Sequence, residues 1–506
     1  MAILDLRRAK NIVVLGGGTA GWFAALSLRR LFSPAVSVKV VESSKIPIVG
    51  VGEGGLLNFI DALERNNIDV TDFIAKTGAA YKWGFSYEGW RGLPENDQYY
   101  HLFADQNAPA TQWKTRGFHP LVSAMIAKNI PLNFALRGFL AIHNNATQEQ
   151  AKTVLDSGKA DIRTSLHFDS YKTATYLKDI ALSRGVIHVD AEVLDITRDE
   201  SGHVRALKAQ DQNIETDFVI DASGLSRKII GQVDAPWRSF SEYLLMDSAV
   251  PFYMPHPKKN PMLVTRAIAM PAGWMWQIPL QHRVGAGYVF SSQHSSPEQA
   301  IQNIQTTLGF EIEPHRTIRF ESGCFEKVWV KNVMALGLSS GFVEPLEATS
   351  IGQMLEQLRN LERLLLNSNA LLSEANIREF NEGNYASWLG IRDFLRMHYD
   401  VPRQDNAFWQ DVARMPMPQS YLEFKEMWQQ RTPRELDVVQ YVKSGWGGIF
   451  HPVNWMMVAA PLGIISETAA RNELYGLKEA DQLKINEWLQ QFFKPVQQQV
   501  GSQQPL

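Results

Sequence analysis

The sequence has almost no cysteine, no long apolar run and no strong excess of either charge. Cys324 is the single cysteine among 506 residues, which excludes an intramolecular disulfide and a metal site built from several cysteines. The net charge is −3, so the composition lacks the basic signature of nucleic-acid-binding and membrane-surface proteins. We therefore expect no nucleic-acid partner, no membrane partner and no metal.

Targeting and membrane segments are also lacking. The longest apolar run, around residues 455–465, contains Pro461 and is too short to cross a bilayer. The first residues are not typical of a signal peptide, because Asp5 and two arginines precede an apolar run that ends in glycines. With 45% hydrophobic and 20% charged residues, the composition is that of an ordinary globular protein. We expect a soluble, cytoplasmic protein.

A nucleotide-binding motif stands near the N-terminus. Residues 12–15 are apolar and mostly β-branched, which predicts a buried strand, and apolar residues at helical spacing follow the glycines. Between them lies the pattern G-x-G-x-x-G. Gly16 permits a tight turn, Gly18 lets a pyrophosphate approach the backbone, and Gly21 lets the helix pack against the strand. The pattern predicts phosphates at the start of the helix, where backbone N–H groups are free.

An acidic residue stands at the expected distance from this motif. Glu42 ends a second predicted strand over residues 36–41, where a carboxylate accepts hydrogen bonds from a ribose. A glycine-rich turn in an ordinary α/β protein is the alternative interpretation. The motif does not by itself separate NAD from FAD, but its place close to the N-terminus favours FAD.

A second glycine-rich stretch and a lysine follow. Gly50, Gly52, Gly54 and Gly55 surround Glu53, which predicts unusual backbone angles or close approach to a ligand, with a surface loop as the alternative. A strand predicted over residues 79–87 carries aromatic residues at alternate positions: Tyr81, Trp83, Phe85 and Tyr87. Lys82 lies on the opposite face and projects away from the aromatic row. The pattern alone favours a solvated lysine.

Two later segments are each compatible with two interpretations, a structural role and a place in a functional site. Trp274 and Trp276 alternate on one face of a predicted strand, which core packing explains equally well. Glu347 precedes a helix that is predicted to begin near Ile351. The N–H groups at that helix start can hold an anion or the electron-rich edge of a flavin. From sequence physics alone, Glu347 is either a buried carboxylate or a surface one favoured by the helix dipole.

The remaining chain divides by composition. Residues 90–145 are aromatic-rich and irregular, and either line a pocket for a flat substrate or pack in the core. Residues 217–224 return a strand to a glycine turn, and 236–330 are mainly predicted strands of a substrate-side sheet. We expect three parts: a discontinuous FAD-binding and substrate-sheet module over 1–350 with an insertion at about 90–160, a mostly helical subdomain over 351–494, and a disordered tail over 495–506.

Together these segments resemble the flavin-dependent halogenases, especially the tryptophan and indole group. The likeness extends over nearly all of the first 400 residues. Its most specific part is the W-x-W-x-I-P signature of Trp274–Pro279. The other matching motifs are Gly16–Trp22 (G-x-G-x-x-G-W), Ile46–Glu53 (I-P-x-x-G-V-G-E), His167–Asp169, Gly285–Tyr288 and Gly341–Glu347.

The resemblance implies a fold and a reaction. The fold is α/β, with a FAD-binding Rossmann-like domain of the flavin monooxygenase and halogenase type, mixed sheets and a C-terminal helical subdomain. The reaction is the FADH2- and O2-dependent chlorination or bromination of an electron-rich, indole-type aromatic. It proceeds through hypohalous acid delivered to Lys82. The sequence contains no evident NAD(P)H-binding unit, so a separate flavin reductase is the implied partner.

The resemblance also assigns roles to residues. Lys82 and Glu347 are the implied catalytic pair. Backbone N–H groups at Thr349 and Ser350 hold the halide, and Trp274 and Trp276 keep the substrate from the flavin. The implied cofactor-binding residues are Gly16, Gly18, Thr19, Ala20, Gly21, Glu42, Gly52, Val193 and Gly337.

The sequence departs from the family pattern in two places. Ala348 and Ser350 stand where tryptophan halogenases usually carry Ser and Gly. The C-terminal region lacks the segment that clamps free tryptophan and has Gly445–Trp455 instead. The native substrate, its attachment to a carrier, and the choice of chloride or bromide therefore stay open. A single-component FAD hydroxylase and a catalytically silent flavin-binding protein remain the alternatives.

Overall fold

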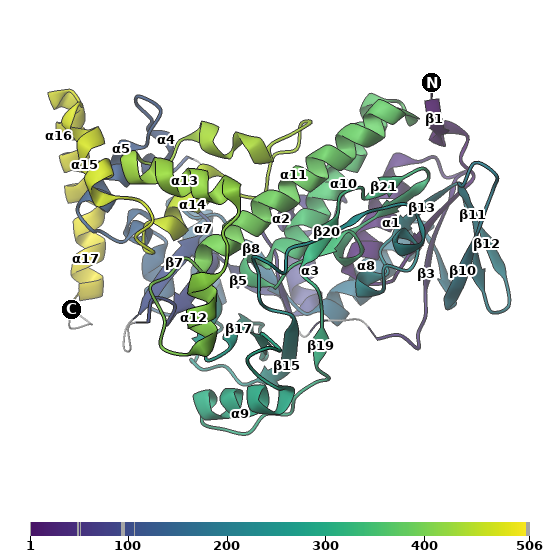
Figure 1. The fold of residues 1–506 in the computed structure, drawn as a ribbon, viewed down its shortest axis with the longest axis horizontal. Coiled ribbons are helices and arrows are strands. Elements are labelled where there is room, and N and C mark those ends of the chain that lie inside the picture. The colour runs from purple at the N-terminus through teal and green to yellow at the C-terminus, as the bar shows by residue number, and fades with distance from the viewer. Residues whose placement is uncertain (1, 48–49, 51, 93–96, 106, 502–506) are drawn as a thin grey trace.

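A six-stranded sheet forms the nucleotide-binding half of the computed structural model, which describes residues 2–47, 50, 52–92, 97–105 and 107–501 (Figure 1). All of its strands are parallel except the first, which pairs antiparallel with the second. Its order is β21 (Trp329–Val330), β22 (Val333–Ala335), β13 (Phe218–Asp221), β2 (Asn11–Leu15), β3 (Ser37–Glu42) and β9 (Ile187–Asp190). The strands predicted on both sides of the glycine motif, and the later return strand, are confirmed.

Burial on both faces explains why these strands are continuous apolar runs. Ile12, Val13 and Val14 of β2 are fully buried, as expected for a parallel sheet that helices cover on each side. Helix α1 (Thr19–Leu31) packs beside α8 (Ser170–Ser183) and α10 (Thr349–Asn367). Strand β8 (Ser165–Phe168) directly precedes α8, and Asp169 is the N-cap of that helix.

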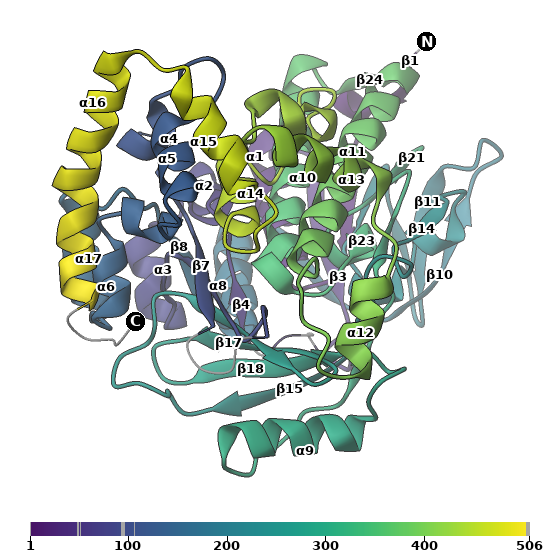
Figure 2. The ribbon, with the colours of Figure 1, turned by 60° about the vertical axis from the view of Figure 1, so that its left-hand side comes forward.

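A seven-stranded mixed sheet forms the other half. Its order is β19 (Ile318–Arg319), β15 (Ser248–Met254), β18 (Val284–Phe290), β17 (Gly273–Pro279), β16 (Thr265–Met270), β6 (Gly84–Glu88) and β7 (Gln98–Leu102). Helix α9 (Pro297–Leu308) covers its outer face, below β15 in Figures 1 and 2. Four of the strands within residues 236–330 (β15, β16, β17 and β18) and the short β19 join this sheet, which the earlier strands β6 and β7 extend, whereas β14 (Trp237–Ser239), β20 (Gly323–Phe325) and β21 belong to other sheets.

The single strand predicted over residues 79–87 is wrong. The strand is interrupted at Trp83, whose N–H donates a hydrogen bond to the carbonyl oxygen of Leu263 at 2.6 Å. Gly84 follows with φ +145°, and a Cβ there would lie 2.2 Å from the carbonyl oxygen of His101. The residues on either side therefore enter different sheets. The first part, β5 (Ala80–Lys82), pairs with β8 (Ser165–Phe168), which also pairs with β4 (Glu53–Gly54).

The insertion near residues 90–160 is helical rather than irregular. It contains α4 (Pro109–Gln112), α5 (Pro120–Ala127), α6 (Phe139–His143) and α7 (Gln148–Asp156). The C-terminal helices α15 (Glu467–Tyr475), α16 (Glu479–Trp488) and α17 (Lys494–Gly501) lie beside it (Figure 2). The disordered tail expected from residue 495 is therefore wrong as far as Gly501, since Val496 is buried against this layer. Residues 502–506 lie outside the described ranges.

Residues 351–494 are mostly helical, as predicted. The elements are α10, α11 (Glu374–His398), α12 (Ala407–Arg414), α13 (Gln419–Gln430), the 3₁₀ helix η7 (Glu435–Tyr441) and α14 (Pro452–Ala459). Helix α11 runs from the nucleotide-binding half to the middle of the molecule (Figure 1). None of the helices in the described ranges combines the length and the hydrophobicity that a bilayer crossing requires.

The smaller elements complete the two halves. Among the described residues they are helices α2 (Asn58–Arg65) and α3 (Val70–Thr77); the strands β10 (Val193–Arg198), β11 (Val204–Ala209) and β12 (Asn213–Glu215); the strands β14 (Trp237–Ser239), β20 (Gly323–Phe325) and β23 (Gly341–Phe342); and the pair β1 (Ala2–Asp5) and β24 (Leu371–Ser373).

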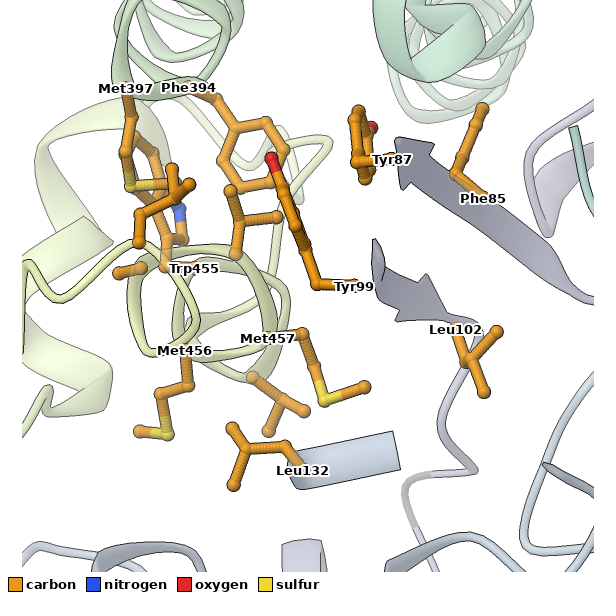
Figure 3. Close-up of a cluster of buried hydrophobic side chains, with 14 of the residues drawn as sticks. Phe85, Tyr87, Tyr99, Leu102, Leu132, Phe394, Met397, Trp455, Met456 and Met457 are labelled. Atoms are coloured by element: carbon orange, nitrogen blue, oxygen red, sulfur yellow. The ribbon is translucent and has the colours of Figure 1, made fainter. Parts of the chain in front are cut away.

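The largest hydrophobic core joins the seven-stranded sheet to the helical part. Figure 3 shows Tyr87 and Tyr99, from β6 and β7, facing Phe394 of α11 and Trp455 of α14. All four side chains are buried. This core fixes the C-terminal end of α11 against the sheet, and the functional residues described next lie at its edge.

Candidate active site

Lys82 ends β5 with a completely buried side chain. Its Nζ has no hydrogen-bond partner among the described residues, and it lies 3.9 Å from the ring centroid of Phe85 and 5.4 Å from that of Phe103. A Cβ at Gly54 would lie 2.7 Å from Nζ, so a larger residue there would displace the Lys82 amine. The expectation that Lys82 points away from the aromatic row is wrong, because the strand breaks directly after it.

The surroundings of Lys82 change its protonation. Burial lowers the pKa of its amine from 10.5 to about 7, although the negative charge of Glu347 acts in the opposite direction. The same buried region keeps the pKa of His167 well below its usual value, first through burial and then through the charge of Lys82. Lys82 therefore presents both an amine and an ammonium near neutral pH.

Glu347 is also completely buried, so the alternative of a surface carboxylate is wrong. The Tyr87 hydroxyl donates to its Oε1. His101 Nδ1 lies 2.9 Å from Oε1 and 2.8 Å from Oε2, and His398 Nε2 lies 3.2 Å from Oε1. Burial acts to raise the pKa of Glu347, but the charges and hydrogen bonds of His101 and His398 outweigh it and hold the pKa well below its usual value. The carboxylate is ionised.

Each imidazole also has a partner on the side away from Glu347. His101 Nε2 lies 2.9 Å from the side-chain amide nitrogen of Asn454. His398 Nδ1 lies 2.9 Å from the carbonyl oxygen of Phe394, while its Nε2 faces Glu347. Both nitrogens of His398 meet acceptors, so this imidazole is cationic. His398 and Glu347 form a buried ion pair.

The backbone directs this carboxylate into the core just before α10. Glu347 has φ +66° and Ala348 has φ +52°, a left-handed region that costs non-glycine residues roughly 1–2 kcal/mol each. Such strain concentrates at functional sites. Thr349 then begins the 19-residue helix α10, whose first turn carries no acidic residue. The hydroxyl oxygens of Thr349 and Ser350 are buried without a partner in the described part of the chain. This helix start suits an anion.

The nucleotide loop has the geometry that its sequence predicts. A Cβ at Gly16, where φ is +116°, would lie 2.2 Å from the carbonyl oxygen of Ala222. A Cβ at Gly21 would lie 1.8 Å from the carbonyl oxygen of Gly16, which identifies the close helix–strand packing. A Cβ at Gly18 would meet nothing within 4 Å, so the backbone is open to a ligand. Helix α1 begins directly afterwards at Thr19. The loop fits a dinucleotide pyrophosphate.

Two other predicted cofactor positions lie near this loop. A Cβ at Gly337, where φ is +61°, would lie 3.2 Å from the Cβ of Ala20. Glu42 lies at the end of β3, 3.0 Å from Lys178 Nζ and 2.9 Å from His188 Nε2. Its carboxylate thus stands at the carboxyl end of the parallel sheet, but it already has two partners there.

The last two predicted cofactor positions lie on other segments of the chain. A Cβ at Gly52 would lie 3.6 Å from the side chain of Ile278, at the end of β17. The stretch from Gly52 to Gly54 therefore connects the seven-stranded sheet to Lys82. Val193 begins β10 and is buried in the core of the nucleotide-binding half.

The two tryptophans of β17 are buried and held differently. Trp274 Nε1 donates to Glu344 Oε2 at 2.7 Å, and the Tyr399 hydroxyl donates to the same oxygen at 2.5 Å. Trp276 lies across Gly287 of the neighbouring strand, where a Cβ would approach the indole to 2.2 Å. The two ring centroids are 6.3 Å apart. The predicted shared face of these tryptophans is confirmed.

Sequence reasoning missed several residues that contact the predicted ones. Glu344 lies three positions before Glu347 in the Gly341–Glu347 motif, so the sequence did indicate a second acidic residue close to the site. Tyr87 and His101 stand in aromatic-rich stretches that gave a weaker one. The remaining residues gave none, because they reach the site from distant helices: His398, Tyr399 and Asn454.

Known proteins resemble nearly the whole chain. A family model described as tryptophan halogenase matches residues 11–474. Uncharacterized protein y4xG of Sinorhizobium fredii is 40% identical over 488 residues, which cover 96% of this chain and 96% of that protein. The 7-chloro-L-tryptophan 6-halogenase KtzR of Kutzneria sp. is 30% identical over 92% of this chain and 95% of its own.

A solved structure supports the same relationship. BrvH, a flavin-dependent halogenase from Brevundimonas sp. BAL3, is 27% identical and has a TM-score of 0.81, with 98% of this chain and 97% of that chain covered. The likeness includes both sheets and the helical part. It confirms the predicted fold class, an α/β fold with a FAD-binding Rossmann-like domain.

Proposed function

Because the chain belongs to the tryptophan halogenase family of flavin-dependent enzymes, we propose that it halogenates an electron-rich, indole-type ring. The reaction uses O2, a halide ion and reduced FAD, which a separate flavin reductase supplies. The observation that carries the proposal is the buried amine of Lys82. Its pKa is lowered, and it interacts electrostatically with the buried, ionised carboxylate of Glu347.

The loop at Gly16, Gly18 and Gly21, with the start of α1, would hold the pyrophosphate of FAD. This assignment rests on the open backbone at Gly18 and on the close packing at the other two glycines. Gly337, beside Ala20, would lie against the same cofactor. Bound reduced FAD supplies the electrons with which O2 converts the halide to hypohalous acid.

The halide would bind at the start of α10. The backbone N–H groups of Thr349 and Ser350, together with the helix dipole, stabilise an anion there. Their buried hydroxyls offer two further donors that have no other partner among the described residues. Thr349 follows Glu347 by only two residues, so the halide site and the catalytic carboxylate share one rigid segment.

Lys82 would carry the oxidised halogen to the substrate. Its ammonium donates a hydrogen bond to hypohalous acid, or its amine takes the halogen to form a haloamine with release of water. Both forms are populated near neutral pH, because the pKa is about 7. The rings of Phe85 and Phe103 beside Nζ keep water from this reactive species.

Glu347 would stabilise the positive charge that develops on the ring. A carboxylate whose pKa is held well below its usual value is a weak general base at neutral pH. The same preorganised charge is well suited to a cationic intermediate in a water-excluded site. The ion pair with His398 fixes the direction of the charge before the substrate arrives.

The test is a turnover assay with the purified full chain. FAD, NADH, a generic flavin reductase and either indole or tryptophan are supplied, with chloride and bromide in parallel, and mass spectrometry identifies the products. Lys82→Ala is expected to abolish halogenation while FAD binding and flavin oxidation persist. Lys152→Ala, which changes an exposed lysine paired with Asp156, is the matched control and should keep full activity.

Each result of this assay distinguishes the proposed function from one of its alternatives. A halogen isotope pattern that disappears only in Lys82→Ala supports the proposal and reveals the halide preference. An oxygenated product without halogen identifies a hydroxylase instead. Normal halogenation by Lys82→Ala refutes the assigned role of Lys82, and FAD binding without any product from either ring refutes the proposed indole-type substrate.

A further inference from the structure

Glu344 is a buried carboxylate that the proposed reaction does not use. It is completely inaccessible, and both donors that reach it, Trp274 Nε1 at 2.7 Å and the Tyr399 hydroxyl at 2.5 Å, bind the same oxygen, Oε2. Its Oε1 has no partner in the described ranges. Burying an ionisable group is costly, so its presence in an aromatic core calls for a reason.

Neighbouring tryptophans satisfy their N–H groups without a carboxylate. Trp90, whose ring centroid lies 6.5 Å from that of Trp274, donates to the carbonyl of Ala267 at 2.9 Å. Trp409 donates to the carbonyl of Met270 at 3.2 Å. Both acceptors belong to β16. Trp274 instead bonds a side chain from a different part of the fold.

That part is the segment that carries the proposed halide and carboxylate groups. Glu344 lies between β23 and the 3₁₀ turn that contains Glu347. The C-terminal end of α11 holds both acidic residues with consecutive side chains, since His398 binds Glu347 and Tyr399 binds Glu344. The hydrogen bond from Trp274 therefore links the β17 aromatic wall, defined as Trp274 and Trp276, to this segment.

We propose that Glu344 is a positioning residue that fixes the indole plane of Trp274 relative to Glu347 and Thr349, and so holds the β17 aromatic wall in place between the flavin and the substrate. The inference rests on the proposed function. Trp276 has its own constraint, because it lies across Gly287 of the adjacent strand. Trp274 depends on Glu344, which supplies its only hydrogen-bond acceptor among the described residues.

The first test separates the hydrogen bond from simple packing. Glu344→Gln keeps an acceptor oxygen for both donors and is expected to keep the yield of halogenated product per flavin oxidised within about twofold of the wild-type yield. Glu344→Leu has no acceptor and is expected to lower this yield about five- to tenfold, with unchanged FAD affinity. Tyr399→Phe, which leaves the bond from Trp274 intact, is the matched control and should resemble Glu344→Gln.

A double-mutant cycle tests whether Glu344 acts through Trp274. In a Trp274→Phe background, which has no N–H to position, Glu344→Leu should change the yield by less than about twofold. An equal loss in both backgrounds would overturn the inference, and so would a wild-type yield from folded, FAD-binding Glu344→Leu.

Crystal structures of the same variants provide a readout that is independent of turnover. The Trp274 indole is expected to keep its orientation in Glu344→Gln and to rotate in Glu344→Leu. An unmoved indole in Glu344→Leu would overturn the inference. If the wild-type protein halogenates nothing, the proposed function fails, and the indole orientation still decides whether Glu344 positions Trp274.

Discussion

Replacing Lys82 with methionine should stabilise the protein while it removes the proposed activity. Methionine keeps an unbranched side chain but needs no hydrogen-bond partner, whereas the Lys82 ammonium is buried without one among the described residues. The fall of its pKa from 10.5 to about 7 corresponds to about 5 kcal/mol of destabilisation when both the folded and unfolded states are protonated. The cation–π contact with Phe85, which methionine loses, offsets about 1–2 kcal/mol of the gain.

The sign and the pH window follow from the same shift. Between pH 7 and 10.5 the unfolded chain binds the proton and the folded chain has released it, so wild-type stability rises with pH across this range. Below pH 7 the penalty is complete and constant. The advantage of Lys82→Met is therefore largest below about pH 7, falls to about 2 kcal/mol at pH 9, where the folded amine is neutral, and vanishes above pH 10.5.

Urea denaturation of the two proteins at several pH values measures this difference. Lys152→Met, at an exposed lysine, controls for the general effect of the substitution and should show no pH-dependent gain. A Lys82→Met advantage that is absent at pH 6.5, or that stays constant between pH 7 and 10, would refute the reasoning about the buried amine.

Two further substitutions test the geometry around Lys82 and Glu347. Glu347→Gln removes the negative charge and leaves the cationic His398 without an ionic partner, so we expect a loss of about 3–5 kcal/mol in unfolding free energy and a fall of at least about 100-fold in single-turnover halogenation. Denaturation and rapid-quench assays measure the two effects, and unchanged values would contradict the buried ion pair. Gly54→Ala places a Cβ 2.7 Å from Lys82 Nζ and should reduce halogenation without reducing FAD affinity. Gly231→Ala, where the nearest atom is 3.9 Å away, is its control, and equal activity of the two variants would refute the close approach.

The parts of the site that depend on neighbouring residues were predictable from the sequence. The glycine loop is one example, because the roles of Gly16, Gly18 and Gly21 follow from local backbone geometry and the structure reproduces them. The start of α10 is another, since a strand followed by an apolar stripe at helical spacing defines it. Both features needed no knowledge of distant contacts.

The direction of Lys82 could not be predicted, because a distant contact decides it. The prediction from side-chain alternation assumes one continuous strand. The hydrogen bond from the Trp83 N–H to the Leu263 carbonyl interrupts that strand. Lys82 then lies over the ring of Phe85 rather than away from it. The residues around Glu347 show the same limit, since His398 approaches it from 51 positions along the chain.

Glu344 and Glu347 lie three residues apart and are equally buried, yet their partners give them opposite protonation behaviour. Burial raises the pKa of Glu344 to about 7, because the neutral donors of Tyr399 and Trp274 compensate only part of the cost. For Glu347 the imidazole partners, including the cationic His398, more than compensate. Environments that separate the pKa values of neighbouring groups also separate their roles. In the proposed reaction, the charge that opposes a cationic ring would therefore come from Glu347, whereas Glu344 accepts the hydrogen bond of the Trp274 indole, which it can do whether or not it is ionised.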